Sequence, residues 1–410
     1  MSSENEETLV ALDIGSTKIC CLVASPKEDG TFDIKGMGLS RSAGLKNGRV
    51  SNIQAATKAI KEAVKLAEEN SELEIGSAFI GIAGEHISGE KVVGSVNING
   101  GVVTESHIQR AIENALQQRV PSNLEILSKI PIEFTIDQRE NVNPKNMHGQ
   151  QLRVTVHVFY VSGDAMGDLT SAVTEAGVDI NDVYLQSVVS AESVLNNDEK
   201  EQGVVLLDIG GGSCDMAVIL NGSVQLIHEI PIGGEALTHD LTTALITSYN
   251  TAEKIKINHG FCYKTFPDED FDIEFPNLDG VTTSTISASL ICQVLYGRIE
   301  ALFGQIALVL ANEGYNEKIK SIVLTGGTSH LRGLAQSAKE YFNCHVRVGG
   351  PICTGSFSDT VDDPIYATAV GLIMYGASHH NTDSENTVVE KKPGFFARLF
   401  KKLFGKSPKK

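Results

Sequence analysis

The alternation of apolar and polar positions singles out one stretch in the second half of the chain. An apolar run at 204–207 ends in Asp208, and a second apolar run begins at Met216. Three glycines at 210–212 and Ser213 lie between the two runs. Two such runs joined by a glycine-rich turn predict a hairpin of two buried strands. The tip of this hairpin would carry a carboxylate beside accessible backbone amides.

The same pattern occurs near the start of the chain. An apolar strand from Val10 ends in Asp13, and another apolar strand follows the turn. The two aspartates are 208 − 13 = 195 residues apart, which is about the length of one domain. Two similar domains that each present such a hairpin would close on one ligand from opposite sides. The first turn contains Gly15, Ser16, Thr17 and Lys18.

Further periodic segments predict alternating strands and helices. The segment 183–195 predicts a short strand that runs into a helix, and 261–280 is acidic, aromatic and irregular. Apolar positions at helical spacing predict helices at 53–68, 105–118, 164–175, 237–259, 284–312 and 364–375. Short apolar or alternating runs predict strands at 32–39, 77–83, 92–98, 125–136, 152–161, 225–232 and 319–324.

This order of elements predicts an α/β protein with two domains. A chain of 410 residues is too long for a single core. The predicted parts are a first domain at 1–83 and 161–195, a small α+β insertion at 84–160, a second domain at 196–376, a flexible linker at 377–390 and a C-terminal helix at 391–410. Within the second domain, 196–236 and 319–376 would form the core and 237–318 an outer subdomain.

The composition is typical of a soluble, cytosolic protein. Hydrophobic residues make up 41% of the chain and charged residues 21%, as in ordinary globular domains. We find no run of eighteen apolar residues that would span a membrane as a helix. Seven cysteines, an odd number without Cys-x-x-Cys spacing, indicate reduced thiols and make a metal site improbable.

The net charge of −17 is unevenly distributed. Residues 391–410 contain eight basic residues and no acidic one, so the other 390 residues carry −17 − 8 = −25. A body this acidic disfavours nucleic acid as a partner. The basic tail therefore needs a separate explanation.

The tail has the pattern of an amphipathic helix. Its apolar residues recur at i, i+1, i+4, i+5, i+8 and i+9, and they occupy about half of the helix circumference. We expect an interfacial helix on an anionic membrane surface, and a groove on a partner protein is the alternative. The apolar set is Phe395, Phe396, Leu399, Phe400, Leu403 and Phe404, and the basic set is Arg398, Lys401 and Lys402.

The two hairpin tips carry the chemistry of a phosphate site. Because glycines lack Cβ atoms, their N–H groups can approach phosphate oxygens closely. A carboxylate beside phosphates suits a magnesium ion that keeps most of its waters. One such hairpin could be an ordinary turn, but its repetition favours phosphate binding. The candidate phosphate ligands are Gly15, Ser16, Thr17, Lys18, Gly210, Gly211, Gly212 and Ser213, and the candidate magnesium carboxylates are Asp13 and Asp208.

Five motifs in a fixed order resemble the actin and sugar-kinase ATPase superfamily. They are the two hairpins, the helix start at 186–195, the turn TGGT at 325–328 and the last helix at 364–376. Within that superfamily, GLKNGRV at 44–50, IVLTGGTSHLRGL at 322–334 and ATAVGLIMYG at 367–376 are similar to the FtsA family of bacterial cell-division proteins. The resemblance covers essentially the full chain. It implies a two-domain actin/sugar-kinase-like ATPase fold with a small α+β insertion subdomain in the first half and a C-terminal amphipathic helix.

The resemblance also implies roles for individual residues. Gln186 falls where the superfamily places a glutamine that orients the attacking water, and a buried amide at a helix start is the alternative. Glu253 and Lys256 match a pair that holds adenine and ribose, although an ordinary intrahelical ion pair would look the same. ATP and magnesium are the implied cofactors. Hydrolysis would be slow at most, because no strong general base is visible. The nucleoside floor would be Gly234, Gly326, Gly327 and Thr328.

The family resemblance further implies partners and a location. The protein would bind the C-terminal peptide of FtsZ, form actin-like filaments, recruit later division proteins through 84–160 and anchor the Z ring to the cytoplasmic face of the inner membrane. The FtsZ site would lie within 261–312, where Arg298 is an isolated cation suited to an acidic peptide. A type IV pilus assembly ATPase and a small-molecule kinase of the same superfamily are the alternatives.

Overall fold

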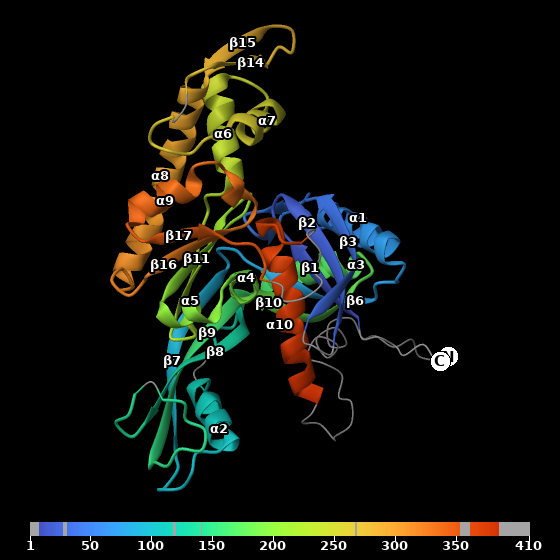
Figure 1. The fold of residues 1–410 in the computed structure, drawn as a ribbon. Helices are drawn as coiled ribbons and strands as arrows, with labels where there is room; N and C mark the ends of the chain where they lie inside the picture. Colours follow the sequence, from blue (N-terminus) through green and yellow to red (C-terminus); the bar gives the residue numbers. More distant parts are fainter. Residues whose placement is uncertain are drawn as a thin grey trace, which may run out of the picture.

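A computed structural model describes residues 8–27, 31–117, 120–140, 142–266, 269–352 and 361–384. Two five-stranded sheets form the centre of this structure, one in each half of the chain (Figure 1). The first sheet has the order β10-β6-β1-β2-β3, in which β1 pairs antiparallel with β2 and parallel with β6. Its strands are β1 (Leu9–Ile14), β2 (Lys18–Pro26), β3 (Phe32–Arg41), β6 (Ser77–Ile82) and β10 (Asp179–Leu185).

The second sheet, β13-β12-β11-β16-β17, repeats this arrangement. β11 pairs antiparallel with β12 and parallel with β16, as β1 does with β2 and β6. The predicted repeat of two hairpins is therefore a repeat of two sheets, and the prediction of two α/β halves is confirmed. The strands are β11 (Val204–Ile209), β12 (Cys214–Leu220), β13 (Ser223–Ile230), β16 (Ser321–Thr325) and β17 (His345–Val348).

The unbroken apolar runs of β1 and β2 arise because both faces of the first sheet are covered. Leu12 and Cys21 lie in one core with α1 (Ile53–Ser71) and α3 (Gly163–Glu175). Ala11 and Leu22 lie in another core with α10 (Ala367–Ser384). A strand that is buried on both faces shows no alternation, and all six residues of β1 are buried.

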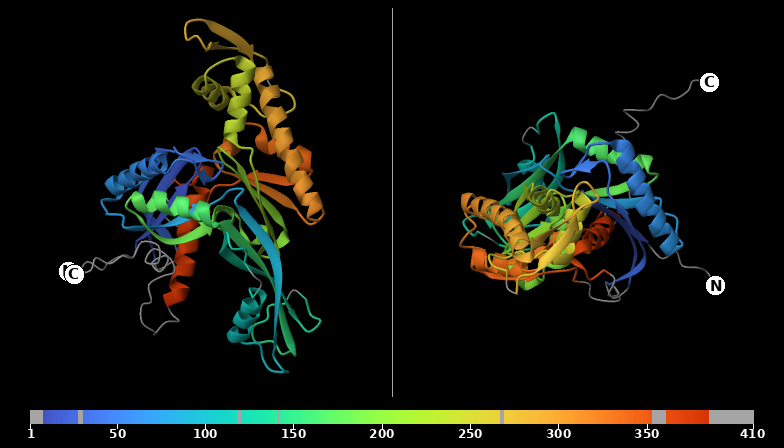
Figure 2. Two further views of the ribbon diagram at one scale, coloured as in Figure 1. Left: turned by 180° about the vertical axis from the view of Figure 1, so that it is seen from behind. Right: turned by 90° about the horizontal axis from the view of Figure 1, so that it is seen from above.

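Between β6 and α3 the chain forms a separate antiparallel sheet, β7-β9-β8, which extends away from the two central sheets (Figures 1 and 2). α2 (Glu105–Ala115) packs closely on this sheet at Gly94, where a Cβ atom would lie 2.0 Å from the carbonyl oxygen of Ala111. This sheet and helix occupy the segment predicted as an α+β insertion. The strands are β7 (Ile87–Asn97), β8 (Leu124–Ile136) and β9 (Gln151–Ser162).

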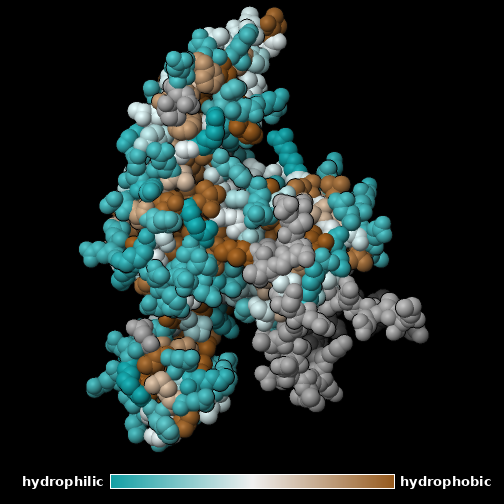
Figure 3. Space-filling view, viewed as in Figure 1, coloured by the Kyte–Doolittle hydropathy of each residue, from teal (hydrophilic) through white to brown (hydrophobic). Residues whose placement is uncertain are grey.

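The second half carries its outer helices at the opposite end of the molecule from this insertion (Figure 2). α8 (Ala288–Asn312) is long and apolar enough to cross a membrane, but nine of its residues are buried, most of them in the core of the second half. We therefore interpret α8 as a core helix. The hairpin of β14 (Asp272–Pro276) and β15 (Thr283–Ser287) covers the tip, where Leu278 and Val281 are exposed and a small apolar spot stands among hydrophilic side chains (Figure 3).

Two predicted helices are wrong in their extent. The segment 237–259 forms two helices, α6 (Gly234–Leu245) and α7 (Tyr249–His259). They separate because Ile246 adopts a left-handed conformation with φ 51°, and the Ser248 side chain accepts the first hydrogen bond of α7. The residues 284–287 belong to β15, so α8 begins only at Ala288.

The predicted flexible linker at 377–390 is wrong over its first eight residues, because α10 continues to Ser384. The rings of Tyr375 and His379, one helical turn apart, stack with their centroids 3.8 Å apart and support this extension. The predicted membrane helix at 391–410 lies outside the described residues. The segment 261–280, predicted to be irregular, contains the strand β14 (Asp272–Pro276). No pattern in the sequence predicted β4 (Leu45–Lys46), β5 (Arg49–Val50), α5 (Asn197–Gln202), α9 (Leu334–Phe342) or β17.

Candidate functional site

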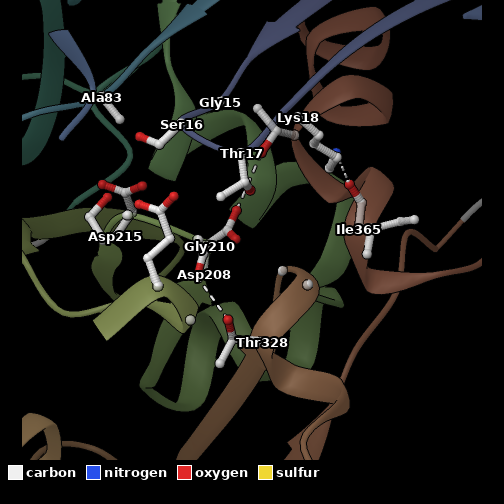
Figure 4. A pocket seen from close by; sticks show the side chains of 18 of the residues that line it. Gly15, Ser16, Thr17, Lys18, Ala83, Asp208, Gly210, Asp215, Thr328 and Ile365 are labelled. Atoms are coloured by element: carbon white, nitrogen blue, oxygen red, sulfur yellow. Dashed lines mark hydrogen bonds between the residues drawn. The ribbon is translucent and has the colours of Figure 1, made fainter. Parts of the chain in front are cut away.

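A cavity of about 420 Å³ lies between the two halves, and the tips of both predicted hairpins line it (Figure 4). Cavities of this size accommodate a small molecule and a few polar anchors. The structure brings together in this cavity every residue predicted to bind phosphate, magnesium or the nucleoside, together with Gln186, the predicted water-orienting residue, at the start of α4 (Gln186–Val194).

The two hairpin turns have the same local structure and meet across the cavity. The N–H of Gly15 donates to the carbonyl oxygen of Lys18 at 3.0 Å, and that of Gly210 donates to Ser213 at 2.9 Å. A Cβ atom on Gly211 would lie 2.1 Å from Cγ2 of Thr17 in the opposite half. The close approach of the halves therefore requires a glycine at this point.

The two predicted magnesium carboxylates lie at the ends of equivalent strands. The Asp208 carboxylate accepts hydrogen bonds from the hydroxyls of Ser190 at 2.8 Å and Thr368 at 3.3 Å. Removal from bulk solvent raises the pKa of Asp208, and the charge of Asp13 raises it further, although the Ser190 bond opposes the shift. Both carboxylates thus lie in a site that favours a compensating cation.

A third carboxylate, Asp215, belongs to the same site and was missed by the sequence analysis. It is paired directly with Asp208 across the β11–β12 hairpin, and it lines the cavity (Figure 4). Desolvation and the charges of Glu229 and Asp208 raise the pKa of Asp215 well above its ordinary value. The signal was present in the sequence, since the turn length that pairs Asp208 with Asp215 could be counted.

Lys18 lies in the cleft but is already bonded to protein. Its Nζ lies 3.2 Å from Oδ2 of Asp13 and donates to the carbonyl oxygen of Ile365 at 2.5 Å (Figure 4). Burial lowers the pKa of Lys18, but the charge of Asp13 and its hydrogen bond outweigh burial and leave the pKa raised. Lys18 is thus a fixed positive charge that ties the first hairpin to the segment before α10.

Gln186 reaches the first hairpin from the start of α4. Its Nε2 lies 3.4 Å from Oδ1 of Asp13. A Cβ atom on Gly81 would lie 2.8 Å from Cγ of Gln186, so glycine leaves room for this side chain. The amide therefore lies in the cleft beside a candidate magnesium carboxylate. In this position the Gln186 amide can orient a water by hydrogen bonding. The amide cannot act as a base, because it does not take up the water's proton.

The nucleoside end of the cavity is built by α6, α7 and the turn after β16. Lys256 lies 2.8 Å from Glu253, and its Nζ also donates to the carbonyl oxygen of Gly234 at 2.8 Å. Thr328 donates to the carbonyl oxygen of Gly210 at 2.8 Å, which joins this turn to the second hairpin. Gly326 has φ 79° and passes so close to Asp208 that a Cβ atom would lie 2.3 Å from Oδ1.

Other cavity residues gave no signal in the sequence. They come from helix faces and loops that only the fold brings to the cleft, and they supply an aromatic ring, two apolar side chains and two polar groups. These residues are Tyr249, Ile257, Leu331, Glu235 and Arg332.

The prediction that Arg298 is an isolated cation is wrong. Its Nε and Nη2 donate to the two carboxylate oxygens of Asp240 on α6 at 2.6 and 2.7 Å. A guanidinium in such a two-point pair is largely neutralised. Arg298 is therefore a poor candidate for attracting an acidic peptide.

The donor set of the cleft fits a hydrated divalent cation. The described residues contain no group of three or more His, Cys, Asp or Glu side chains arranged to enclose a metal ion. Magnesium usually needs only one or two carboxylates, because waters and phosphate oxygens complete its shell. Asp13 and Asp208 offer that number at the place where the two hairpins meet.

Comparison with known families identifies two parts of the chain. A family model described as "Cell division protein FtsA" matches residues 205–371, and one described as "SHS2 domain inserted in FTSA" matches residues 84–160. The cell division protein FtsA of Pseudomonas aeruginosa is 35% identical over 377 residues, which cover 92% of this chain and 90% of the relative. FtsA of Escherichia coli is 31% identical over 395 residues, 94% of each chain.

Solved structures share the fold at low identity. One described as the PilM-PilN type IV pilus biogenesis complex has a TM-score of 0.66 and 15% identity, covering 90% of this chain and 99% of that chain. MreB5 of Spiroplasma citri bound to ADP has a TM-score of 0.56 and 13% identity, covering 94% of this chain and 100% of that chain. These likenesses and the matched inserted domain confirm the predicted two-domain actin-like fold with a subdomain in its first half.

Proposed function

The chain belongs to the FtsA family of cell-division proteins, and from this premise we propose that it holds ATP between its halves and links FtsZ to the membrane at the division septum. The observation that carries the proposal is the meeting of two glycine turns across the cleft, each beside a carboxylate, Asp13 or Asp208. MreB5 of Spiroplasma citri, which shares the fold, was solved bound to ADP. A nucleotide in this cleft would touch both halves at once.

We assign the parts of the nucleotide to the two ends of the cleft. The backbone amides and hydroxyls of the two turns would bind phosphate oxygens. Magnesium, held by Asp13 and Asp208 largely through waters, would neutralise phosphate charge when bound. The adenosine would lie between the turn at Gly326 and the pair of Glu253 and Lys256, where Tyr249 and Ile257 supply apolar surface.

Hydrolysis of ATP would be slow in this site. Gln186 is a neutral amide that can orient a water but cannot remove its proton. Asp215 lies close by, and desolvation and the charges of Glu229 and Asp208 raise the pKa of its carboxyl. The nucleotide would therefore act mainly as a ligand that fixes the two halves in one orientation.

The C-terminal peptide of FtsZ would bind beside α8. A hollow of about 170 Å³ lies there, and it combines aromatic surface with an exposed ion pair, which suits a peptide that carries both apolar and acidic residues. Lys264 offers the positive charge that Arg298 cannot, because its 2.6 Å pair with Glu340 is solvent-exposed and easily exchanged. The hollow is lined by Tyr263, Lys264, Tyr296, Ser337, Glu340 and Tyr341.

The remaining roles belong to the ends of the molecule. The insertion at 84–160 would recruit later division proteins, and the apolar tip with Leu278 and Val281 would contribute to self-association into filaments. The basic segment at 391–410 would bind anionic lipid on the cytoplasmic face of the inner membrane. The acidic body disfavours nucleic acid as a partner of this assembly.

Recruitment of FtsZ to vesicles tests the proposed function. With the full chain and ATP, FtsZ should sediment with vesicles containing anionic lipid and should stay in solution with zwitterionic vesicles. A chain lacking 391–410 should recruit no FtsZ, whereas Lys264→Glu should still bind the vesicles and lose most FtsZ. Sedimentation of FtsZ with the truncated chain would contradict the proposal.

A type IV pilus role is the second candidate, because the pilus complex shares the fold with a TM-score of 0.66. At 15% identity this likeness concerns the fold alone. A pull-down with the C-terminal peptide of FtsZ separates the candidates, since only a division protein should retain it. A small-molecule kinase would instead show ATP consumption that a sugar or carboxylate substrate stimulates.

A further inference from the structure

The insertion subdomain contacts the second half, although it is inserted in the first. Its chain leaves the first half at Gly84 and returns at Ser162, and between these points β8 lies against β13 of the second sheet. Nζ of Lys91 on β7 donates to the phenol oxygen of Tyr315, which follows α8, at 3.1 Å. Figures 1 and 2 show the three strands running past the second sheet toward the end of the molecule.

Tyr315 is a rigid anchor for this contact. Its residue is only 5% exposed and belongs to the core of the second half. Its N–H donates to the carbonyl oxygen of Leu310 at 2.8 Å, which closes the last turn of α8. Lys91 and Lys318 also lie over its ring, with Nζ 5.7 and 5.2 Å from the centroid. A bond to the hydroxyl of so fixed a ring holds Lys91 in place.

The other end of the contact is equally constrained. Lys91 is paired across the sheet with His157, which is 4% exposed and whose ring packs on Phe159 at 4.1 Å. A Cβ atom on Gly89 would lie 2.7 Å from Nε2 of His157, so glycine leaves room for this packing. Burial and the charge of Lys91 lower the pKa of His157 to about 4, so His157 is neutral and does not compete for the tyrosine.

The insertion is also packed into the first half, where Val161 at the end of β9 belongs to the core and Ile87 packs against it. Gly84 has φ 141°, a conformation that other residues rarely adopt, and it is followed by the exposed Glu85. Burial raises the pKa of Glu229 on β13 to about 7, and the charge of Glu85 adds to this shift. The insertion is thus held by the core of the first half at one end and by Tyr315 of the second half at Lys91.

We propose that the insertion subdomain is a strut between the two halves, in which the Lys91–Tyr315 bond limits how far the nucleotide cleft can open. This inference rests on the proposed function of the cleft. A partner that displaces β7 from Tyr315 would then speed nucleotide release, and by linkage the bound nucleotide would change the affinity of the insertion for that partner.

The release of a fluorescent ATP analogue, chased with excess ATP, tests the strut in the full-length protein. Lys91→Met keeps the aliphatic stem and removes the donor, and we expect release about tenfold faster, the scale of one charged hydrogen bond. Tyr315→Phe should have the same effect, and the double variant should add little to either. Lys318→Met, which removes the other cation over the ring within the same half, should stay within twofold of wild type. Equal release from Lys91→Met and Lys318→Met would overturn the strut.

Amide hydrogen exchange without nucleotide keeps this test separate from ATP binding. In Lys91→Met, residues 124–136 and 223–230 should exchange severalfold faster than in Lys318→Met, because the seam between β8 and β13 opens more often. If the wild-type protein bound no ATP, the proposed function would fail. The difference in hydrogen exchange between Lys91→Met and Lys318→Met would still show whether the Lys91–Tyr315 bond holds the insertion against the second half. If both segments exchanged at the same rate in Lys91→Met as in Lys318→Met, the strut would be overturned.

Discussion

Gly211 shows most directly why the hairpin turns are rich in glycine. A Cβ atom there would lie 2.1 Å from Cγ2 and 2.5 Å from Oγ1 of Thr17, which belongs to the other half. The backbone of Gly211 does not adopt a left-handed conformation, so its own geometry does not demand glycine. The constraint comes from the contact between the halves.

Gly211→Ala should therefore hold the halves apart and weaken ATP binding. We expect at least a tenfold loss of affinity, about 1.4 kcal/mol, in a titration with a fluorescent ATP analogue. The melting temperature should change little, because each half keeps its own core. Gly76→Ala is the matched control, since a Cβ atom there meets nothing within 4 Å. Equal affinities of the two variants would show that the turns do not need this contact.

Glu229 should make stability depend on pH. Burial and the charge of Glu85, opposed by Ser213, raise its pKa from 4.5 to about 7. A carboxyl with a raised folded-state pKa stabilises the fold fully below pH 4.5 and loses this contribution as the pH rises through 7. Glu229→Gln should match wild type near pH 4.5 and be more stable at pH 8 by about 1 kcal/mol, allowing for partial exposure. If the difference in melting temperature between wild type and Glu229→Gln were the same at every pH across this range, the assignment of a raised pKa to Glu229 would be contradicted.

Single residues were predictable where the chemistry is local to one turn. Asp13 and Asp208 follow apolar strands directly and precede glycines, so their place at a hairpin tip was visible. The place of Asp215 depends on the register between β11 and β12, which pairs it with Asp208. Arg298 was wrongly interpreted because its partner, Asp240, lies 58 residues earlier on another helix.

At the scale of elements, apolar periodicity identified most helices and strands but not their breaks. The helical pattern of 237–259 continues without a gap, yet Ile246 stands in a left-handed conformation between α6 and α7. A β-branched residue is strained there, and no sequence rule places it at such a position. The break matters for function, because it directs Glu253 and Lys256 on α7 toward the cleft.

Ile246→Gly should stabilise the protein by relieving that strain. Ile246 is 73% exposed, so little buried surface is lost, and glycine adopts φ 51° without cost. We expect a gain of roughly 0.5–1.5 kcal/mol in unfolding free energy. Ile257→Gly is the control, an isoleucine of similar exposure inside α7, where glycine should cost about 1 kcal/mol. A destabilised Ile246→Gly protein would show that the conformation is not strained.

At the scale of the whole molecule, the internal repeat predicted the two halves and the cleft, because each hairpin belongs to its own sheet. The packing of the insertion on the second half was not predictable. Lys91 and Tyr315 are 224 residues apart and carry no motif. Only the path of β7 past the second sheet makes them neighbours.

The central claim, that ATP with magnesium is held between the two hairpins, is tested most directly by titrating labelled ATP into wild type and Asp208→Asn, with and without magnesium. Asparagine keeps the shape and the bonds to Ser190 and Thr368 but removes the charge. With magnesium we expect at least tenfold weaker binding by the variant.

Without magnesium the order should reverse, because the Asp208 carboxylate then only repels the triphosphate. Asp240→Asn, which removes a carboxylate outside the cleft, should match wild type in both conditions. If wild type and Asp208→Asn bound ATP with the same affinity in the presence of magnesium, the claim would be contradicted.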